Sequence, residues 1–246
     1  MLYLLLFIVG IVTSTINVMA GGGSFLTIPL LIFMGLPPTV ANGTNRIGIL
    51  FQSIFAVKGF LSHKVLPVKF TLLISIPAII GSLIGAYLAA VMDDESFKQY
   101  LIFFMLFITA VTIFRSGKEN FEIEKQITPL KWVLLYCTFF VIGLYGGFIQ
   151  AGVGFFILAG VVSTGFDLLK SNAVKTFLIL IFTLFVLPVF IYFQKISLLP
   201  GLVLGAGNIV GAMIGVKIAV KVGHKYIRYV VAACILCFCL ILIINM

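Results

Sequence analysis

The chain has 246 residues, of which 62% are hydrophobic and only 9% charged, and its mean hydropathy is +1.28. This composition excludes a water-soluble globular domain, because such a domain needs far more polar surface. The net charge of +9 is better explained by cationic loops on the cytoplasmic side of a membrane than by nucleic-acid binding. Several apolar stretches reach the roughly 20 residues that span a bilayer, so we expect an all-α polytopic membrane protein.

The first apolar stretch runs from Leu2 to Leu36 and is broken by three consecutive glycines, Gly21 to Gly23. Its opening residues resemble a signal peptide in hydrophobicity, but the first Lys or Arg of the chain is Arg46. Because a signal peptide begins with a basic region, we interpret this stretch as mature structure. Three further apolar segments follow, at 47–61, 70–92 and 100–114, before a polar stretch at 116–128.

The same order of segments then repeats in the second half of the chain. A long apolar stretch from Trp132 to Gly165 is broken at Gly152 and Gly154, and it is followed by apolar segments at 177–193, 198–220 and 227–244. We therefore expect a first transmembrane repeat at 1–117, a cytoplasmic linker at 118–129 and a second transmembrane repeat at 130–246.

A pair of glycines four residues apart also recurs. Gly81 and Gly85 in the first repeat correspond to Gly211 and Gly215 in the second, about 130 residues later. Small residues at this spacing let two helix backbones approach closely. We therefore predict that both pairs are helix-packing faces.

The distribution of positive charge predicts how the broken stretches cross the membrane. If each crosses once, the 16 Lys and Arg residues divide about evenly between the two faces. If each doubles back, Arg46, Lys98 and Lys195 fall on one face and all the others on the opposite face. Because Lys and Arg concentrate on the cytoplasmic side, we predict that each broken stretch is a hairpin or a re-entrant element. Each repeat then adds three transmembrane helices, the two repeats are inverted, and both termini face outside.

The glycine breaks are the best candidates for a binding site, because duplicated helix breaks mark the substrate sites of many transporters. Glycines expose backbone N–H groups, and a helix that restarts at Ser24 would direct the positive end of its dipole at the break. The candidate substrate-binding residues are Asn17, Gly21, Gly22, Gly23, Ser24, Asn42, Thr44, Asn45 and Arg46 in the first repeat, and Gln150, Gly152, Gly154, Asn172, Lys175 and Thr176 in the second.

The polar members of this set favour an anionic ligand. Ionisable groups inside a membrane protein are costly and usually functional, and we expect Arg46 and Lys175 to approach one cavity from opposite sides. The alternative is that each extends to the lipid headgroups. Asn42 and Asn172 align in the two repeats and can donate hydrogen bonds to an anion. Asn17 and Gln150 either line the site or bind neighbouring helices; the remaining hydroxyls and amides are further donors.

Other residue types exclude several classes of function. Six of the seven acids fall in expected loops and only Asp167 lies near a repeated element, so an aspartyl intramembrane protease and a carboxylate-rich pump are not supported. The chain has no P-loop pattern. Its two histidines lie in expected loops, and Cys137, Cys234, Cys237 and Cys239 are interpreted as apolar packing residues. We therefore expect no metal site and no cofactor.

Several motifs resemble a known family. Residues 17–29 (NVMAGGGSFLTIP), 35–38 (GLPP) and 43–46 (GTNR), with 143–148 (GLYGGF), are similar to the signatures of the TauE/SafE sulfite exporter family, also called the toluene-sulfonate uptake permeases, in particular its YfcA-like members. The family's first-half lysine is Arg46 here, and its second-half motif N-T-K reads Ala173-Val174-Lys175. The resemblance implies transport of sulfite, thiosulfate, sulfonates or related organosulfur anions.

We therefore expect a multi-pass plasma-membrane protein that is a secondary transporter of small sulfur oxyanions and not an enzyme. The substrate would be held at the midplane during alternating access between the two repeats. Its expected partners are the anionic substrate and the lipid bilayer, without nucleic acid, and the sequence leaves a homo-oligomer open. A passive anion channel that uses the same cations is the alternative.

Overall fold

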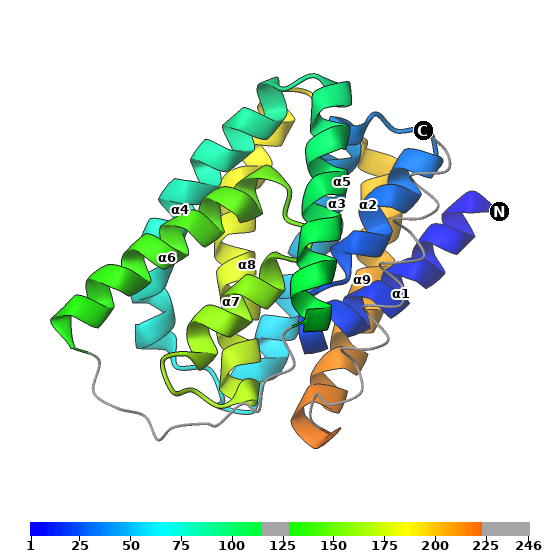
Figure 1. The fold of residues 1–246 in the computed structure, drawn as a ribbon. Coiled ribbons are helices and arrows are strands. Elements are labelled where there is room, and N and C mark those ends of the chain that lie inside the picture. Colours follow the sequence, from blue (N-terminus) through cyan, green and yellow to red (C-terminus); the bar gives the residue numbers. More distant parts are fainter. Residues whose placement is uncertain (115–127, 223–246) are drawn as a thin grey trace.

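The computed structural model describes residues 1–114 and 128–222, and all regular structure in these residues is helical (Figure 1). In chain order the helices are α1 (Leu2–Ala20), α2 (Ser24–Phe33), α3 (Pro38–Ser62), α4 (Val68–Val91), α5 (Asp94–Phe114), α6 (Pro129–Phe148), α7 (Val153–Val162), α8 (Leu168–Tyr192) and α9 (Leu198–Val222). The segment predicted at 227–244, three of the four cysteines and most of the predicted linker lie outside the described residues. The fourth cysteine, Cys137, is exposed on α6.

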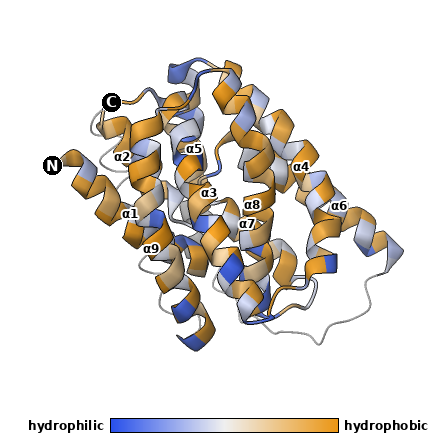
Figure 2. Ribbon diagram, turned by 180° about the vertical axis from the view of Figure 1, so that it is seen from behind, coloured by the Kyte–Doolittle hydropathy of each residue, from blue (hydrophilic) through white to orange (hydrophobic). Residues whose placement is uncertain are grey.

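Five of the described helices, α1, α4, α6, α8 and α9, are long and apolar enough to cross a membrane. Figure 2 shows apolar residues along most of the length of the helices. The expected all-α polytopic membrane fold is therefore confirmed. By contrast, α2 and α7 have ten residues each, about 15 Å at 1.5 Å per residue, and are too short to span a bilayer of about 30 Å.

Three helix starts differ from the sequence prediction. α3 begins at Pro38 rather than at residue 47, and α8 begins at Leu168 rather than at residue 177. The polar residues that follow each break therefore lie inside helices. α5 begins at Asp94 rather than at residue 100, so Asp94 and Glu95 form its acidic first turn instead of belonging to a loop.

Each glycine break reverses the direction of the chain. α1 ends at Gly21, whose φ of 97° is in the left-handed region, and α2 begins at Ser24. A Cβ on Gly23 would clash with the carbonyl of Thr13 in α1, so the start of α2 lies against the helix that precedes it. In the second repeat, the start of α7 likewise lies against α6, where Val153 contacts Gly146. Each break is therefore the tip of a hairpin with one long arm and one short arm.

Glycine stripes bring two pairs of helices into backbone contact. A Cβ on Gly81 or Gly85 of α4 would overlap the carbonyls of Phe140 and Leu144 in α6. Gly211 of α9 has the same relation to the carbonyl of Ile11 in α1. The two predicted G-x-x-x-G packing faces are therefore confirmed, and in both pairs the contacts advance in the same direction along the two helices, so α4 runs parallel to α6 and α9 runs parallel to α1.

The remaining contacts fix the other helix directions. Gly48 of α3 lies against Leu204 and Gly59 against Val216, so α3 runs parallel to α9. α4 runs parallel to α8, because the ring of Phe70 contacts that of Phe166 just before the start of α8, and the ring of Tyr87 contacts that of Phe193 just after its end. The start of α3 meets the end of α8, where Gly43 lies against Lys195. Thus α1, α3 and α9 run one way through the bundle, and α4, α6 and α8 run the other way.

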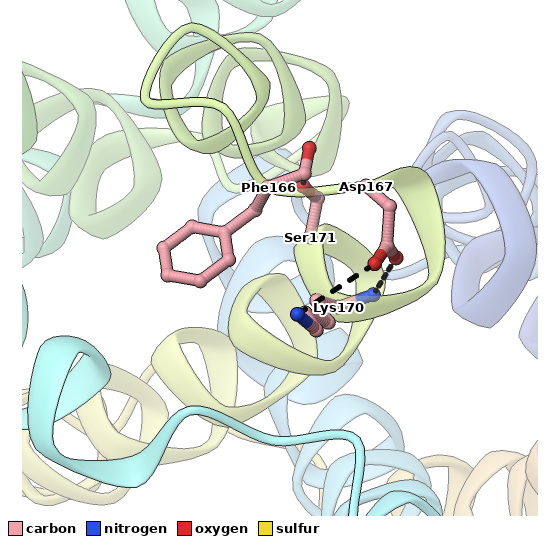
Figure 3. Close-up of polar contacts among 4 residues, drawn as sticks. All are labelled: Phe166, Asp167, Lys170 and Ser171. Atoms are coloured by element: carbon pink, nitrogen blue, oxygen red, sulfur yellow. Dashed lines mark hydrogen bonds and ion pairs between the residues drawn. The ribbon is translucent and has the colours of Figure 1, made fainter. Parts of the chain in front are cut away.

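The start of α8 is capped within its own chain segment (Figure 3). Asp167 accepts a hydrogen bond from the backbone N–H of Lys170 at 2.8 Å, and its carboxylate lies 4.0 Å from the Lys170 ammonium. Ser171 donates to the carbonyl of Phe166. Asp167 is half-exposed, so the one acid near a repeated element is a helix cap at the edge of the bundle.

The start of α3 is capped instead by α5. Asp94 Oδ1 accepts from the backbone N–H of Thr39 at 2.9 Å and from its hydroxyl at 2.7 Å. A carboxylate at this position satisfies an N–H group that has no partner within the helix. The contact therefore fixes the helix that carries Asn42, Asn45 and Arg46.

We expect Asp94→Ala to lower the free energy of unfolding by about 1–2 kcal/mol, the usual cost of removing such a cap. Glu95→Ala is the matched control, because Glu95 is exposed in the same turn and surface changes of this kind stay within about 0.5 kcal/mol. Thermal unfolding of the two purified variants in detergent measures the difference. Equal midpoints would show that the cap contributes nothing to stability.

Candidate functional site

The two hairpin tips touch each other inside the bundle. A Cβ on Gly21 would lie 2.7 Å from Gly154 Cα, and a Cβ on Gly154 would lie 2.5 Å from Gly21 Cα. Next to this contact, the ring of Phe25 in the first turn of α2 lies against Gly152, whose φ is 73°. Only residues without a side chain allow this approach, and two of them also require left-handed backbone. The predicted glycines Gly21, Gly152 and Gly154 are thus brought together.

Both predicted cations lie inside the protein. Arg46 and Lys175 are 0% and 1% exposed, so neither extends to the lipid headgroups. Arg46 lies about 12 Å along α3 and Lys175 about 10 Å along α8 at 1.5 Å per residue. The two helices run in opposite directions, so they begin at opposite ends of the bundle. Since half a bilayer core is about 15 Å thick, both side chains belong near the middle of the bundle.

Arg46 binds the end of the long hairpin arm of the second repeat. Its Nη1 and Nη2 atoms donate to the carbonyl of Gly146 at 3.2 Å, and Nη2 also donates to the carbonyl of Gly147. The guanidinium carbon lies 4.6 Å from the ring centroid of Phe190. The last carbonyls of a helix have no partner within it and carry partial negative charge. Arg46 therefore acts as a C-terminal cap for α6.

Lys175 makes the reciprocal contact with the first repeat. Its ammonium donates to the carbonyls of Asn17 and Val18 near the end of α1, at 2.8 and 2.9 Å, and to Oδ1 of Asn172 at 2.8 Å. An ammonium has three donors, so these contacts use all of them. Each cation thus caps the broken helix of the other repeat.

The paired asparagines complete the same two caps. Asn42 donates from Nδ2 to the carbonyl of Phe148 at 2.9 Å, and Asn172 donates from Nδ2 to the carbonyl of Met19 at 3.0 Å. Asn42 lies one turn before Arg46, and Asn172 lies one turn before Lys175. The structure therefore brings an asparagine and a cation together at each break, as two equivalent clusters rather than as one ring around a single ligand.

The two clusters differ in what they leave unpaired. Oδ1 of Asn42 and Nε of Arg46 are buried and have no hydrogen-bond partner in the described part of the chain. Nδ2 of Asn45 and Oε1 of Gln150 are unpaired there as well. Three of these four atoms belong to side chains of α3, and the fourth belongs to Gln150 at the second break, which α3 caps. At the other break, the ammonium of Lys175 has partners, and so do both Nδ2 and Oδ1 of Asn172.

The other predicted residues hold neighbouring elements together. Thr44 accepts from the backbone N–H of Ser197 just before α9, and Asn45 accepts from the hydroxyl of Thr27 in α2. Thr176 bonds within α8, to the carbonyl of Asn172. Asn17 donates to Gln52 at 3.1 Å. Gly22, Gly23 and Ser24 are buried at the first hairpin tip.

Gln150 lies at the second hairpin tip in left-handed backbone, with φ of 66°. Its Nε2 atom lies 3.5 Å from the hydroxyl of Thr183 in α8, at the limit for a hydrogen bond. The hydroxyl of Tyr145 closes this tip by donating to the carbonyl of Ala151. Gln150 is therefore held beside Asn42 and Arg46 by its own chain segment.

Sequence reasoning missed four buried polar residues in the helices that follow the breaks. They are Thr27, Gln52, Ser53 and Thr183, all at most 3% exposed. Ser53 and Thr183 correspond in the two repeats at the same offset as the glycine pairs, and Ser53 Oγ has no partner within the described ranges. A search for aligned polar residues within the apolar segments, and not only at the breaks, would have found this pair.

The geometry suits a small anion better than a cation or a metal. α2 and α7 begin at the touching hairpin tips, and the N-terminal end of a helix carries partial positive charge. The N–H groups of Phe25, Leu26, Val153 and Phe155 already bind carbonyls of the tips. The buried cations add two positive charges, whereas the described acids lie at Asp93, Asp94, Glu95 and Asp167, at helix starts away from the tips.

Comparison with known families identifies the chain. The family model described as "Sulfite exporter TauE/SafE" matches residues 6–242. The chain belongs to this family. The TauE/SafE resemblance expected from the glycine signatures is therefore confirmed, and the protein is a membrane transporter rather than an enzyme.

Several TauE/SafE relatives match over most of their length. A probable membrane transporter protein of Haemophilus influenzae is 32% identical over 225 residues, which cover 91% of this chain and 88% of the relative. The probable membrane transporter protein ORF9 of a Sinorhizobium species is 29% identical over 91% of this chain and 85% of its own length. The probable membrane transporter protein YfcA of Escherichia coli is 29% identical over 91% and 82%. No solved structure gives a significant match.

Proposed function

We propose that this TauE/SafE transporter carries small oxyanions, among them sulfite or sulfonates, by alternating access between two inverted repeats. The observation that carries the proposal is the contact between the hairpin tips at Gly21 and Gly154, with a buried cation capping each broken helix. The contact gathers two helix N-termini and two positive charges at one depth of the bundle. An anion is the ligand that this field favours.

The helix directions support the inverted relation of the repeats. By order along the chain and by length, α1 corresponds to α6, α2 to α7, α3 to α8 and α4 to α9. α1, α3 and α9 run opposite to α4, α6 and α8, so three of the four corresponding pairs are antiparallel by their contacts. Inverted repeats around a midplane site are the arrangement that many secondary transporters use for alternating access.

The proposed orientation follows from the cations at the two ends of the bundle. Lys98 lies in the first turns of α5 and Lys195 lies between α8 and α9, at the end where α3 begins. The opposite end carries Lys58, Lys64, Lys69, Lys131, Lys170, Lys217 and Lys221. Since cationic loops face the cytoplasm, we place that end in the cytoplasm of the cell and the N-terminus outside.

Sulfur oxyanions are proposed because the family is described as sulfite exporters. A tetrahedral or pyramidal XO₃ group can accept hydrogen bonds from several directions at once. The unpaired Nε of Arg46 is a charged donor of the kind that oxyanions require.

Uptake into liposomes tests the proposal. We expect purified protein in liposomes to take up labelled sulfite or methanesulfonate with saturation, and an excess of unlabelled anion on the far side to accelerate uptake by counterflow. Liposomes without protein are the control for leak. Ohmic single-channel currents without counterflow would instead indicate a passive pore, and the absence of flux for every anion would contradict the proposed substrate class.

A further inference from the structure

Two buried atoms on one face of α3 lack partners and are of opposite kinds. Asn42 and Arg46 are four residues apart and therefore lie one above the other on the helix. Asn42 Oδ1 and Arg46 Nε each have no hydrogen-bond partner among residues 1–114 and 128–222. Both side chains are 0% exposed. A buried polar group without a partner is costly, so such atoms mark a place where a ligand can be bound.

The chemical kind of each atom is fixed by the contacts of its own side chain. The other end of the Asn42 amide binds the carbonyl of Phe148, and a carbonyl can only accept, so that end is the NH₂ group and the free atom is an oxygen acceptor. Arg46 Nε can only donate. A ligand that satisfies both must therefore offer both an acceptor and a donor.

The neighbouring amides can adapt to either kind of ligand atom. Asn45 and Gln150 each contact a hydroxyl, that of Thr27 and that of Thr183, and a hydroxyl both donates and accepts. The free ends of these two amides can therefore present either an oxygen or an NH₂ group. The requirement for both an acceptor and a donor in the ligand comes from Asn42 and Arg46 alone.

The charge at this cluster sets the charge of the ligand. Arg46 is the one cation here with an unpaired N–H group, because the three donors of Lys175 are used at the other break. A single cation with a free donor matches a single negative charge, since an unbalanced buried charge is strongly disfavoured.

We propose that the Asn42–Arg46 cluster binds an oxyanion in its singly protonated form, a monoanion that keeps one O–H group, such as hydrogen sulfite. The inference rests on the proposed function and specifies its substrate. An unprotonated oxygen of the ligand accepts from Arg46 Nε, and the ligand's O–H donates to Asn42 Oδ1. The substrate then brings its own proton across the membrane, and the protein needs no titrating acid of its own to move one.

Binding of three anions to the full-length protein in detergent tests the inference. Sulfite is the main probe, because its second ionisation lies near neutral pH. Methanesulfonate is a monoanion without an O–H group, and sulfate is a dianion. We expect the Kd for total sulfite to rise about tenfold per pH unit above the second ionisation of sulfite. The Kd for methanesulfonate should stay constant over the same range and be at least about tenfold weaker than that for hydrogen sulfite.

A pair of variants separates ligand recognition from helix capping. Asn42→Ala and Asn172→Ala each remove an amide that caps the end of a broken helix, but only Asn42 has a free acceptor. We expect Asn42→Ala to bring the Kd ratio of methanesulfonate to hydrogen sulfite close to one. In Asn172→Ala the ratio should remain that of the unmodified protein, although both variants lose thermal stability.

The possible outcomes distinguish the inference from the proposed function. Equal affinity for total sulfite on both sides of its ionisation, or sulfate binding as tightly as hydrogen sulfite, overturns the protonated-substrate inference and leaves anion transport standing. Equal effects of the two variants on the Kd ratio also overturn it. If none of the three anions binds at any pH, the inference and the proposed substrate class both fail.

Discussion

Arg46→Met is expected to lower the initial rate of anion uptake into liposomes by about 100-fold or more. The substitution keeps an unbranched apolar stem but removes the charge, the free Nε donor and the cap on Gly146 and Gly147. Removing one partner of a buried charged contact costs about 2–5 kcal/mol, and about 2.7 kcal/mol already corresponds to a 100-fold change. Lys69→Met is the control, because it removes one exposed cation outside the site.

A second variant separates the effect of the positive charge from that of the forked guanidinium group. Arg46→Lys keeps a cation that can still cap the end of α6, but it has no Nε donor and no planar fork. We expect this variant to fold and to retain about a tenth of the uptake rate. Both variants are first compared by thermal unfolding in detergent, so that loss of fold is measured separately. Folded Arg46→Met protein that transports at the unmodified rate would exclude Arg46 from the site.

Gly21→Ala is expected to lower the free energy of unfolding by about 2–5 kcal/mol. Two effects combine: the backbone of Gly21 has φ of 97°, and the new Cβ would lie 2.7 Å from the backbone of Gly154. Left-handed backbone costs a residue with a side chain about 1–2 kcal/mol, and overpacking adds about 1–3 kcal/mol. We expect loss of transport together with a lowered unfolding midpoint.

Two other glycines allow the two effects to be measured apart. Gly35 has φ of 93° but no atom within 4 Å of a new Cβ, so Gly35→Ala reports the backbone cost alone. Gly154 is inside α7, and its Cβ would meet Gly21 Cα at 2.5 Å, so Gly154→Ala reports the clash alone. If Gly21→Ala is no less stable than Gly35→Ala, the hairpin tips separate easily and their contact does not hold the site closed.

The sequence predicted the limits of some helices much better than those of others. The limits of α4 and α9 differ from the expected segments by at most two residues. The starts of α3 and α8 were placed nine residues too late, because Asn42, Asn45 and Arg46, with Asn172 and Lys175, lower local hydropathy. Hydropathy measures transfer of a side chain to lipid, whereas these side chains are buried inside the protein, and Asn42, Arg46, Asn172 and Lys175 bind its carbonyl groups.

The candidate site was predicted in composition but not in connectivity. Aligned breaks, asparagines and cations identified the residues that lie around the hairpin tips. That Arg46 caps α6 and Lys175 caps α1 depends on how the two repeats dock, and a single sequence contains no measure of that register. The unpaired atoms of Asn42 and Arg46 were likewise beyond sequence reasoning, since satisfaction of a buried group depends on ångström-scale geometry.

The reciprocal caps have a consequence for how the protein is made. The carbonyl of Asn17 is separated from its partner Lys175 by 158 residues, and that of Gly146 from Arg46 by 100. A nascent chain therefore inserts its first hairpin long before the ribosome reaches the lysine that completes it, and that hairpin tip stays unfinished until most of the protein has been synthesised. Neither repeat supplies the cation that caps its own broken helix, so the two halves can complete their hairpin tips only together.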